Sequence, residues 1–195
     1  KRIDGALAKS QKELDDKVQK IKGVFIGPSC FIGNDVVIGE NTIIETNCVI
    51  EDGVHIGKNS HISSNVVIHR NCLIGKNCII SSGAIIGSEG FGNARTKKKD
   101  WLPIAHLGNV QLGDNVSIGA NTTIDRGTVK DTEVHEGVKI DNLVHIAHNV
   151  HVKKGAFIIA CAEVSGGVEV GENAWLAPNS CTHQKIKIGN GAIVG

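Results

Sequence analysis

The sequence predicts an all-β fold, a parallel β-helix in which short strands wind around a narrow core. Isoleucine recurs at every sixth position of one long run, 24 of the 195 residues are glycine, and aromatic residues are scarce. Each hexapeptide of such a pattern supplies one strand and one turn, and three hexapeptides close a coil of about 18 residues. Coils stack at a strand spacing of about 4.8 Å, so the core follows the helix axis. The unbroken series consists of Ile26, Ile32, Ile38, Ile44, Ile50, Ile56, Ile62, Ile68, Ile74, Ile80 and Ile86.

Residues 1–23 precede the repeats and predict a short helix, which we interpret as an N-terminal cap or linker. Leu7, Leu14, Val18 and Ile21 follow one another at spacings of seven, four and three residues, which suit one face of an amphipathic helix. The β-helix domain is expected over residues 24–195. Its last residues stop within a hexapeptide and the sequence contains no methionine, so we expect the chain to be truncated.

Two interruptions of the six-residue period predict loops on the surface of the β-helix. The period is lost through residues 87–107, resumes at Leu112, and slips again over residues 125–133. From Val134 it continues to the last residues, with Thr182 in one aliphatic position. Rigid coils hold such insertions in place, and loops of this kind often carry binding function.

Composition excludes several classes of function. The formal net charge is +1 and only six residues are aromatic, which argues against a nucleic-acid binder that stacks bases on aromatic rings. No apolar run reaches the length of a membrane span and no signal peptide is visible. We therefore expect a cytoplasmic protein with no integral membrane segment.

The cysteines are predicted to be reduced core residues rather than disulfide partners or metal ligands. Cys30, Cys48, Cys72 and Cys78 each lie four residues after an isoleucine of the series, in the second inward position of the hexapeptide. The sequence contains no Cys-x-x-Cys pair, which both metal sites and redox motifs favour. Buried thiols behave as small apolar side chains.

The densest group of histidines lies in residues 141–151 and contains the candidate general base. Ile146 occupies the inward position, so His148, two residues later, is expected near a corner with its side chain outward. Imidazole exchanges protons near neutral pH and suits general-base chemistry. An outward histidine on a repeat fold is otherwise an ordinary surface residue.

The sequence motifs around His148 are more specific than the histidine alone. They read IGSEGFG at 86–92, GANTTIDRG at 119–127, DT at 131–132 and IDNLVHIAHN at 140–149, in this order. Together they resemble the UDP-3-O-acylglucosamine N-acyltransferases of lipid A biosynthesis, and the resemblance covers residues 24 to about 170. Related enzymes acylate other nucleotide-linked amino sugars.

The resemblance implies a left-handed parallel β-helix that forms a homotrimer, with active sites between neighbouring subunits. It implies transfer of an acyl group from a thioester, either acyl-CoA or acyl carrier protein, to the amine of a nucleotide-linked amino sugar. No bound cofactor or metal is expected. By the same resemblance, His148 is the general base that removes a proton as the amine attacks the thioester.

Other candidate site residues flank His148 in the sequence. Asp141 and Asn142 are candidates for polar or oxyanion contacts, although turn residues have the same composition. His183 follows His148 by 35 residues, almost two coils, so both can project from one edge. The resemblance places Lys185 where related enzymes carry a second active-site histidine.

The first loop contains candidate contacts for the substrate or the acyl carrier. Gly90 and Gly92 permit close approach of the backbone to a ligand, while Phe91 and Trp101 are expected to shape the cleft or an acyl channel. The basic run at 95–99 is suited to CoA phosphates or an acidic carrier protein. Each lysine is equally explained as part of a solvated loop tip.

Three alternatives remain open at this point. Lipid A enzymes carry a uridine-binding domain before the β-helix, which residues 1–23 do not supply, so an enzyme of surface-polysaccharide assembly fits better than a strict lipid A enzyme. A zinc enzyme of the γ-carbonic-anhydrase type needs three converging ligands, whereas His145, His148 and His151 occupy different hexapeptide positions. A non-catalytic β-solenoid favours uniform coils, which the two insertions interrupt.

Overall fold

A computed structural model of the chain describes residues 22–195. The helix predicted within residues 1–23 lies outside the described residues. Within the described part the structure consists of strands and turns, with no helix.

Short strands form the whole regular structure. They are β1 (Phe25–Ile26), β2 (Phe31–Ile32), β3 (Val37–Ile38), β4 (Ile43–Ile44), β5 (Val49–Ile50), β6 (His55–Ile56), β7 (His61–Ile62), β8 (Val67–Ile68), β9 (Leu73–Ile74), β10 (Ile79–Ile80), β11 (Ile85–Ser88), β12 (Asn93–Arg95), β13 (Trp101–Pro103), β14 (Val110–Leu112), β15 (Ser117–Ile118), β16 (Thr123–Asp125), β17 (Thr132–Val134), β18 (Lys139–Ile140), β19 (His145–Ile146), β20 (His151–Val152), β21 (Phe157–Ile158), β22 (Glu163–Val164), β23 (Glu169–Val170), β24 (Trp175–Leu176), β25 (Lys187–Ile188) and β26 (Ile193–Val194).

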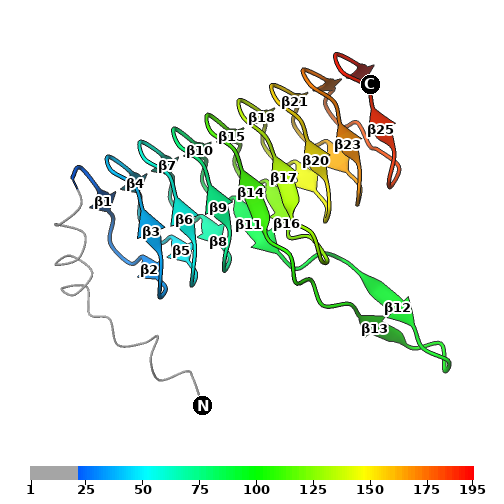
Figure 1. The fold of residues 1–195 in the computed structure, drawn as a ribbon, viewed down its shortest axis with the longest axis horizontal. Helices are drawn as coiled ribbons and strands as arrows, with labels where there is room; N and C mark the ends of the chain where they lie inside the picture. Colours follow the sequence, from blue (N-terminus) through cyan, green and yellow to red (C-terminus); the bar gives the residue numbers. More distant parts are fainter. Residues whose placement is uncertain (1–21) are drawn as a thin grey trace.

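Three parallel sheets form the sides of the stacked coils (Figure 1). The first side runs β1-β4-β7-β10-β15-β18-β21-β24-β26, the second β2-β5-β8-β11-β16-β19-β22, and the third β3-β6-β9-β14-β17-β20-β23-β25. Apart from the separate pair β12 and β13 and the step from β24 to β25, consecutive strands of the chain therefore lie on successive sides. The predicted parallel β-helix is confirmed, and its three-sided coils are consistent with the left-handed course that the resemblance implies.

The register stacks the isoleucines of the series above one another. Ile44 pairs with Ile62, and Ile62 pairs with Ile80, so each inward side chain contacts its equivalents one coil away. Nearly all inward positions are fully buried and form one core along the axis. Burial of apolar side chains is the main favourable term in folding.

Three of the four predicted core thiols are fully buried, and Cys30 is half-buried against the same core. Their thiols bond to backbone oxygens of the next coil; Cys48 Sγ lies 3.1 Å from the Ser63 carbonyl oxygen. Burial raises the pKa of the Cys72 thiol to about 11, so this residue remains a thiol at neutral pH. The interpretation of these cysteines as core fillers is confirmed.

Asparagine residues stabilise one edge of the coils. Asn41, Asn59, Asn77 and Asn115 all adopt the left-handed backbone region, with φ between 56° and 62°. Their side chains form a ladder in which each amide Nδ2 donates to the Oδ1 atom of the next asparagine, at 3.1 to 3.2 Å. Asparagine adopts this region more readily than most residues, so each one satisfies both the turn and the ladder.

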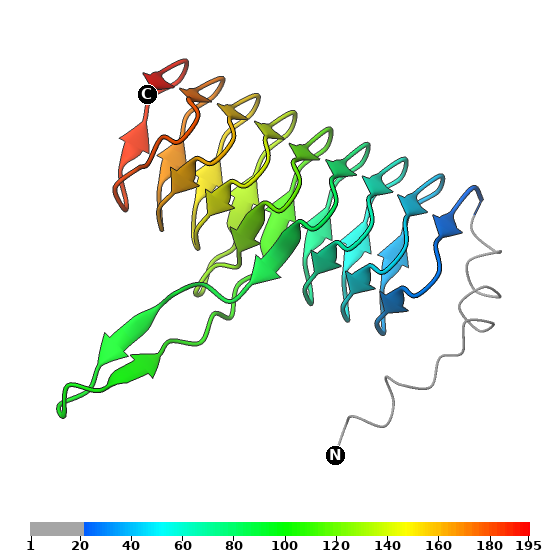
Figure 2. The same ribbon diagram turned by 180° about the vertical axis from the view of Figure 1, so that it is seen from behind.

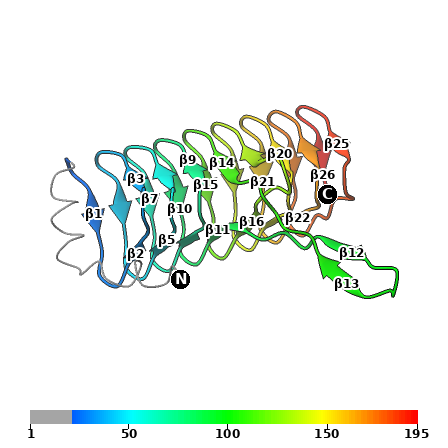
Figure 3. The same ribbon diagram turned by 60° about the horizontal axis from the view of Figure 1, so that its bottom comes forward.

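Both predicted insertions are present, and the first contains a hairpin that the sequence analysis did not foresee. Strands β12 and β13 pair antiparallel, with Asn93 opposite Pro103 and Arg95 opposite Trp101. The hairpin extends away from the coils (Figures 1, 2 and 3). The second insertion joins β16 to β17. Hydrogen bonds from Leu107 N to Thr128 O and from Gly108 N to Gly127 O, at 2.8 and 2.9 Å, connect the two insertions.

The asparagine ladder generates a stability prediction at Asn59, which bonds to asparagines on both sides. We expect Asn59→Ala to lower the free energy of unfolding by about 1–2 kcal/mol, because alanine is strained in the left-handed region and the ladder is broken. Asn59→Gly relieves the backbone strain and removes only the side-chain bonds, so it should cost less. Urea unfolding followed by circular dichroism compares the two; equal losses would contradict the role of backbone strain.

Candidate active site

His148 lies at the corner between the second and third sides of the β-helix, just after β19. Both insertions reach this corner. The first supplies His106 and Gly90, and the second supplies Thr128 and Lys130. The corner is therefore the place where the interruptions of the repeat meet.

The tautomer of His148 follows from its neighbour Asn149. The backbone N–H and the hydroxyl of Thr128 both donate to Asn149 Oδ1, and Asn149 Nδ2 donates to the Lys130 carbonyl oxygen. These contacts fix which end of the amide carries the oxygen. His148 Nδ1 lies 3.0 Å from that oxygen, so Nδ1 carries the hydrogen and the uncharged ring has its lone pair on Nε2. Within the described residues, Nε2 has no hydrogen-bond partner.

A second imidazole, His106, lies against the first. Its residue is 1% exposed, and its ring centroid is 5.2 Å from that of His148 in an edge-to-face arrangement. His106 Nδ1 lies 2.9 Å from the Ile104 carbonyl oxygen, and its backbone N–H donates to Glu89 Oε2 at 3.2 Å. Since a carbonyl only accepts, Nδ1 carries the hydrogen of this ring too. His106 Nε2 is buried without a partner among the described residues.

Three glycines fit around the two imidazoles. A Cβ atom at Gly90 would lie 2.6 Å from His106 Nε2 and 3.0 Å from His148 Cβ, and one at Gly92 would lie 2.9 Å from His106 Cε1. On the next coil, a Cβ at Gly166 would lie 2.9 Å from His148 Cε1. The prediction for Gly90 and Gly92 was close approach of a ligand; in the structure the groups that approach them are the two imidazoles.

A buried carboxylate lies close to these imidazoles. Asp125, only 6% exposed, accepts a hydrogen bond of 2.8 Å from the Ser88 hydroxyl, and its Oδ2 lies 3.7 Å from His145 Nε2. Burial raises the pKa of this carboxyl above its ordinary value, against the opposing effects of Ser88 and of the imidazoles of His145, His148 and His106. Keeping this buried carboxyl ionised therefore costs free energy.

Arg126 holds the base of the first insertion. Its side chain is buried, with Nε 2.8 Å from the Gly87 carbonyl oxygen and Nη2 3.0 Å from that of Arg70. Its backbone N–H donates to Ser88 O at 2.9 Å. Gly87, with φ of +88°, lies at a register shift between β11 and β16. One guanidinium therefore connects the coil before the insertion, its first residue and the coil after it.

Asp141 and Asn142 do not meet His148. Asp141 Oδ2 accepts from Ala160 N at 3.2 Å, and Asn142 Oδ1 accepts from Ala120 N at 2.7 Å. Both residues lie between β18 and β19, one corner earlier in the same coil. The structure assigns them to turns, and the polar partner of His148 is Asn149.

His183 lies on the same corner as His148, two coils later, as its spacing predicted. It is exposed, and its Nδ1 is 3.2 Å from the neighbouring Gln184 carbonyl oxygen. Lys185 adopts the left-handed region with φ of 59°, and its N–H donates to Gly166 O at 3.0 Å. Neither side chain contacts the two imidazoles.

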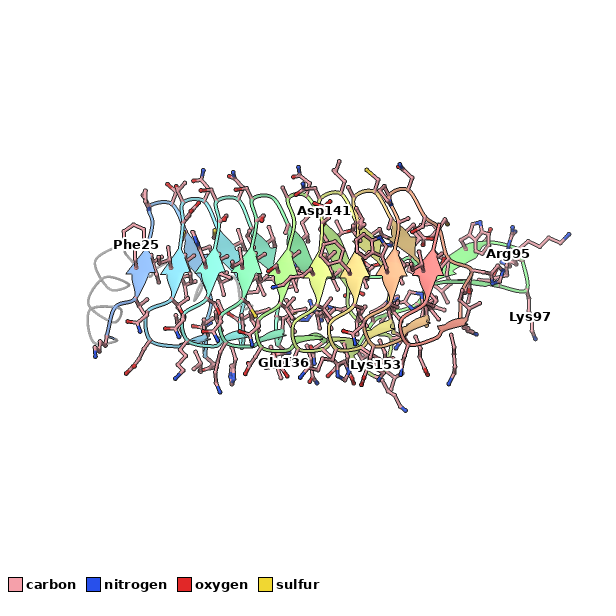
Figure 4. The ribbon with its side chains drawn as sticks, turned by 90° about the horizontal axis from the view of Figure 1, so that it is seen from above. Phe25, Arg95, Lys97, Glu136, Asp141 and Lys153 are labelled. Carbon is pink, nitrogen blue, oxygen red and sulfur yellow. The ribbon has the colours of Figure 1, made fainter. Side chains whose placement is uncertain are left out.

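Two hollows lie on the first insertion. One of about 510 Å³ is lined by Phe91, Asn93 and Trp101, and another of about 470 Å³ is lined by residues that include Gly90, Gly92 and Ile104. Phe91 is 95% exposed and Trp101 63%. The Arg95 guanidinium lies 4.0 Å from the centre of the Trp101 ring, and Figure 4 shows Arg95 and Lys97 at the outer end of the hairpin.

The three histidines considered as zinc ligands bond to different partners. Thr123 Oγ1 lies 2.8 Å from His145 Nδ1, while His151 Nδ1 lies 3.3 Å from Glu133 Oε2. Among the described residues, no group of three His, Cys, Asp or Glu side chains is arranged to hold a metal ion. The same region has no helix long and apolar enough to cross a membrane.

Sequence reasoning put His148 forward as the candidate base and did not foresee the side chains that surround it. Asn149 and Asp125 belong to the sequence motifs that carry the resemblance. Because Asn149 directly follows His148, its position alone could have suggested a hydrogen bond between them. His106 lies in an insertion without periodicity, so no pattern in the sequence placed it beside His148.

Comparisons with known proteins agree with this architecture. A family model described as "Bacterial transferase hexapeptide (six repeats)" matches residues 22–52 and 53–88, and one described as "Hexapeptide repeat of succinyl-transferase" matches residues 109–129. A search of curated proteins found no match. The predicted resemblance to hexapeptide-repeat acyltransferases is confirmed by these repeats and by solved structures.

Three of the similar structures are UDP-N-acetylglucosamine acyltransferases. That of Campylobacter jejuni has a TM-score of 0.67 at 23% identity and covers 87% of this chain and 62% of its own. That of Francisella novicida has a TM-score of 0.67 at 25% identity, covering 87% and 68%. That of Bacteroides fragilis has a TM-score of 0.63 at 27% identity, covering 88% and 62%. The chain thus spans about two thirds of the length of these proteins.

The buried Asp125 predicts a pH-dependent effect on stability. Its pKa is raised in the folded protein, so as pH rises from about 4 the unfolded chain releases a proton that the folded protein retains, and the contribution of Asp125 to stability falls. We expect the melting temperature of Asp125→Asn, relative to the wild type, to increase with pH over this window. The exposed Asp35 provides the matched control, Asp35→Asn. A difference that is constant with pH would contradict the prediction.

Proposed function

We propose that the protein is an acyltransferase that moves an acyl group from a thioester to the amine of a nucleotide-linked amino sugar, with His148 as general base. The observation that carries this proposal is the Nε2 lone pair of His148, which Asn149 orients at a corner where Gly90 lines an adjoining hollow. The names of the similar structures support acyl transfer and a UDP-linked sugar. These names do not specify an amine as the acceptor. The amine acceptor is supported by the resemblance of the sequence motifs to N-acyltransferases.

The chemistry proceeds without a covalent enzyme intermediate. The amine nitrogen attacks the thioester carbonyl carbon while His148 Nε2 takes one of its protons, which forms a tetrahedral oxyanion and an imidazolium. The intermediate then collapses, the carbon–sulfur bond breaks, and the imidazolium returns its proton to the departing sulfur. Asn149 Oδ1 accepts from Nδ1–H throughout, and the nearby Asp125 carboxylate favours the imidazolium.

The first insertion is proposed to receive the acyl donor. The hollow beside Phe91 and Trp101 offers apolar surface to an acyl chain, and the exposed basic run at 95–99 offers positive charge. Such charge suits the phosphates of CoA or an acidic acyl carrier protein. The donor is therefore acyl-CoA or acyl carrier protein, and no bound cofactor takes part.

Exposed apolar residues on the two insertions support the proposed homotrimer. Phe91, Leu107 and Val129 are 95%, 76% and 79% exposed. Apolar side chains clustered at a functional corner are typical of a surface that a second subunit covers. In the proposed trimer the corner at His148 faces a neighbouring copy of the chain. The proposal also places the protein in the cytoplasm.

Strict N-acylation of UDP-3-O-acylglucosamine in lipid A biosynthesis is the second candidate. The match to UDP-N-acetylglucosamine acyltransferases favours a UDP-linked sugar, which the second candidate requires and the first permits. They differ in the sugar and in the acyl carrier.

A panel of donors and acceptors tests the proposed reaction. The intact protein is incubated with acetyl-CoA, a hydroxyacyl-CoA or a hydroxyacyl carrier protein, together with UDP- and dTDP-linked amino sugars, and products are identified by mass spectrometry. We expect an amide product with at least one pair. Transfer from the carrier protein to UDP-3-O-acylglucosamine would identify the lipid A reaction. Transfer from CoA to an amino-deoxysugar would identify N-acylation of another nucleotide-linked amino sugar. Acylation of hydroxyls alone would contradict the proposal.

Substitution of His148 tests its role as base. Since a positioned general base accelerates a reaction by about 10²–10⁴-fold, we expect His148→Ala and His148→Gln to lower kcat by a factor in this range, with the assembly intact by light scattering. His135→Ala, at a half-buried position just after β17, serves as the control and should retain the wild-type rate. A His148 variant with wild-type turnover would rule out the assigned role.

A further inference from the structure

We propose that His106 is a second polar contact for the acceptor substrate, with its Nε2 atom accepting a hydrogen bond from the attacking amine. The pair of imidazoles would then select an amine over a hydroxyl as the nucleophile. This inference rests on the proposed function and assigns a specificity-determining residue to that reaction.

The first observation is the unsatisfied nitrogen. His106 Nδ1 is committed to the Ile104 carbonyl oxygen at 2.9 Å, and Nε2 is buried with no partner in the described part of the chain. Buried polar atoms nearly always have a hydrogen-bond partner, and an exception calls for a reason such as a catalytic role. A packing role alone would be served as well by an apolar ring, which has no nitrogen to desolvate.

The second observation is the common tautomer of the two rings. Each Nδ1–H donates to an oxygen, Ile104 O for His106 and Asn149 Oδ1 for His148. In its uncharged form each ring therefore presents an acceptor at Nε2. The ring centroids are 5.2 Å apart, and the proposal places the attacking amine between the two acceptors.

An amine and a hydroxyl make different demands on such a pair. A neutral primary amine attacks with its lone pair and carries two N–H bonds, of which one loses its proton to His148 and the other remains on nitrogen in the amide product. The remaining N–H needs an acceptor when water is excluded. A hydroxyl has a single hydrogen, which His148 takes, so it gives His106 nothing to accept. The second acceptor therefore favours nitrogen.

The substrate reaches His106 past Gly90. The backbone of Gly90 covers Nε2, and a Cβ atom there would lie 2.6 Å from it. Gly90 also lines the hollow of about 470 Å³, and its neighbour Glu89 is exposed. The proposal requires an outward shift of the turn at residues 89–92, which would expose Nε2 to this hollow, and glycine at position 90 has no side chain to displace.

Kinetics on a matched pair of acceptors test the inference. The acceptors are a UDP-linked amino sugar and its counterpart with a hydroxyl in place of the amine. We expect His106→Phe, which retains an aromatic ring against His148, to lower kcat/KM for the amine at least tenfold and to leave any transfer to the hydroxyl within about twofold. His106→Gln, which restores an acceptor oxygen, should recover most of the amine activity. His135→Phe is the matched control and should behave as the wild type.

A spectroscopic readout keeps the test independent of turnover. In protein labelled with ¹⁵N-histidine, we expect the amino sugar to shift the Nε2 resonance of His106 and the hydroxyl sugar to leave it unchanged. If His106 only packs against His148 and orients it, His106→Phe should lower kcat/KM equally for both acceptors, and the amino sugar should not shift the Nε2 resonance of His106. That result would overturn the inference. A wild-type protein that acylates no amine would instead overturn the proposed function.

Discussion

The register between successive coils is the constraint on which the rest of the structure depends. Most strands contain two residues, and each is held by the strands directly before and after it in its sheet. Such strands are not stable alone, so every coil relies on its neighbours for backbone hydrogen bonds and for burial of its isoleucines. An extra residue within a strand would move an inward side chain outward. Insertions are therefore confined to corners, and functional groups gather where insertions occur.

Two insertions at one corner create a site that neither makes alone. The second fixes Asn149 through Thr128 and Lys130, and Asn149 fixes the tautomer of His148. The first places His106 and Gly90 against the same ring. Arg126 ties both to the coils through carbonyl oxygens at Gly87 and Arg70. A buried guanidinium is tolerated here because these oxygens replace its hydration.

The parts of the molecule that repeat were predictable from sequence, and the parts that depart from repetition were not. The isoleucine period predicted the coils, the inward cysteines and the positions of both insertions, because one residue type at one spacing determines each side chain's direction. The same count of hexapeptide positions places residues 141–142 one corner before His148, yet the sequence also offers both as candidate polar contacts, and it is the structure that shows their side-chain oxygens bonded to backbone N–H groups of neighbouring coils. To predict that His106 lies beside His148, one would need the path of the first insertion. That path depends on the pairing of residues 93–95 with 101–103, and no sequence period specifies it.

Orientation and charge are supplied to His148 by different residues. In a hydrolytic triad one carboxylate both orients the imidazole and stabilises its charged form. Here the neutral oxygen of Asn149 sets the tautomer, while the buried Asp125 carboxylate acts on three imidazoles through space and is bonded to Ser88. An amide oxygen fixes the ring and strengthens its hold on the proton less than a carboxylate would. In the proposed reaction the proton is returned to the leaving sulfur in the same turnover, and this separation suits a base that also acts as an acid.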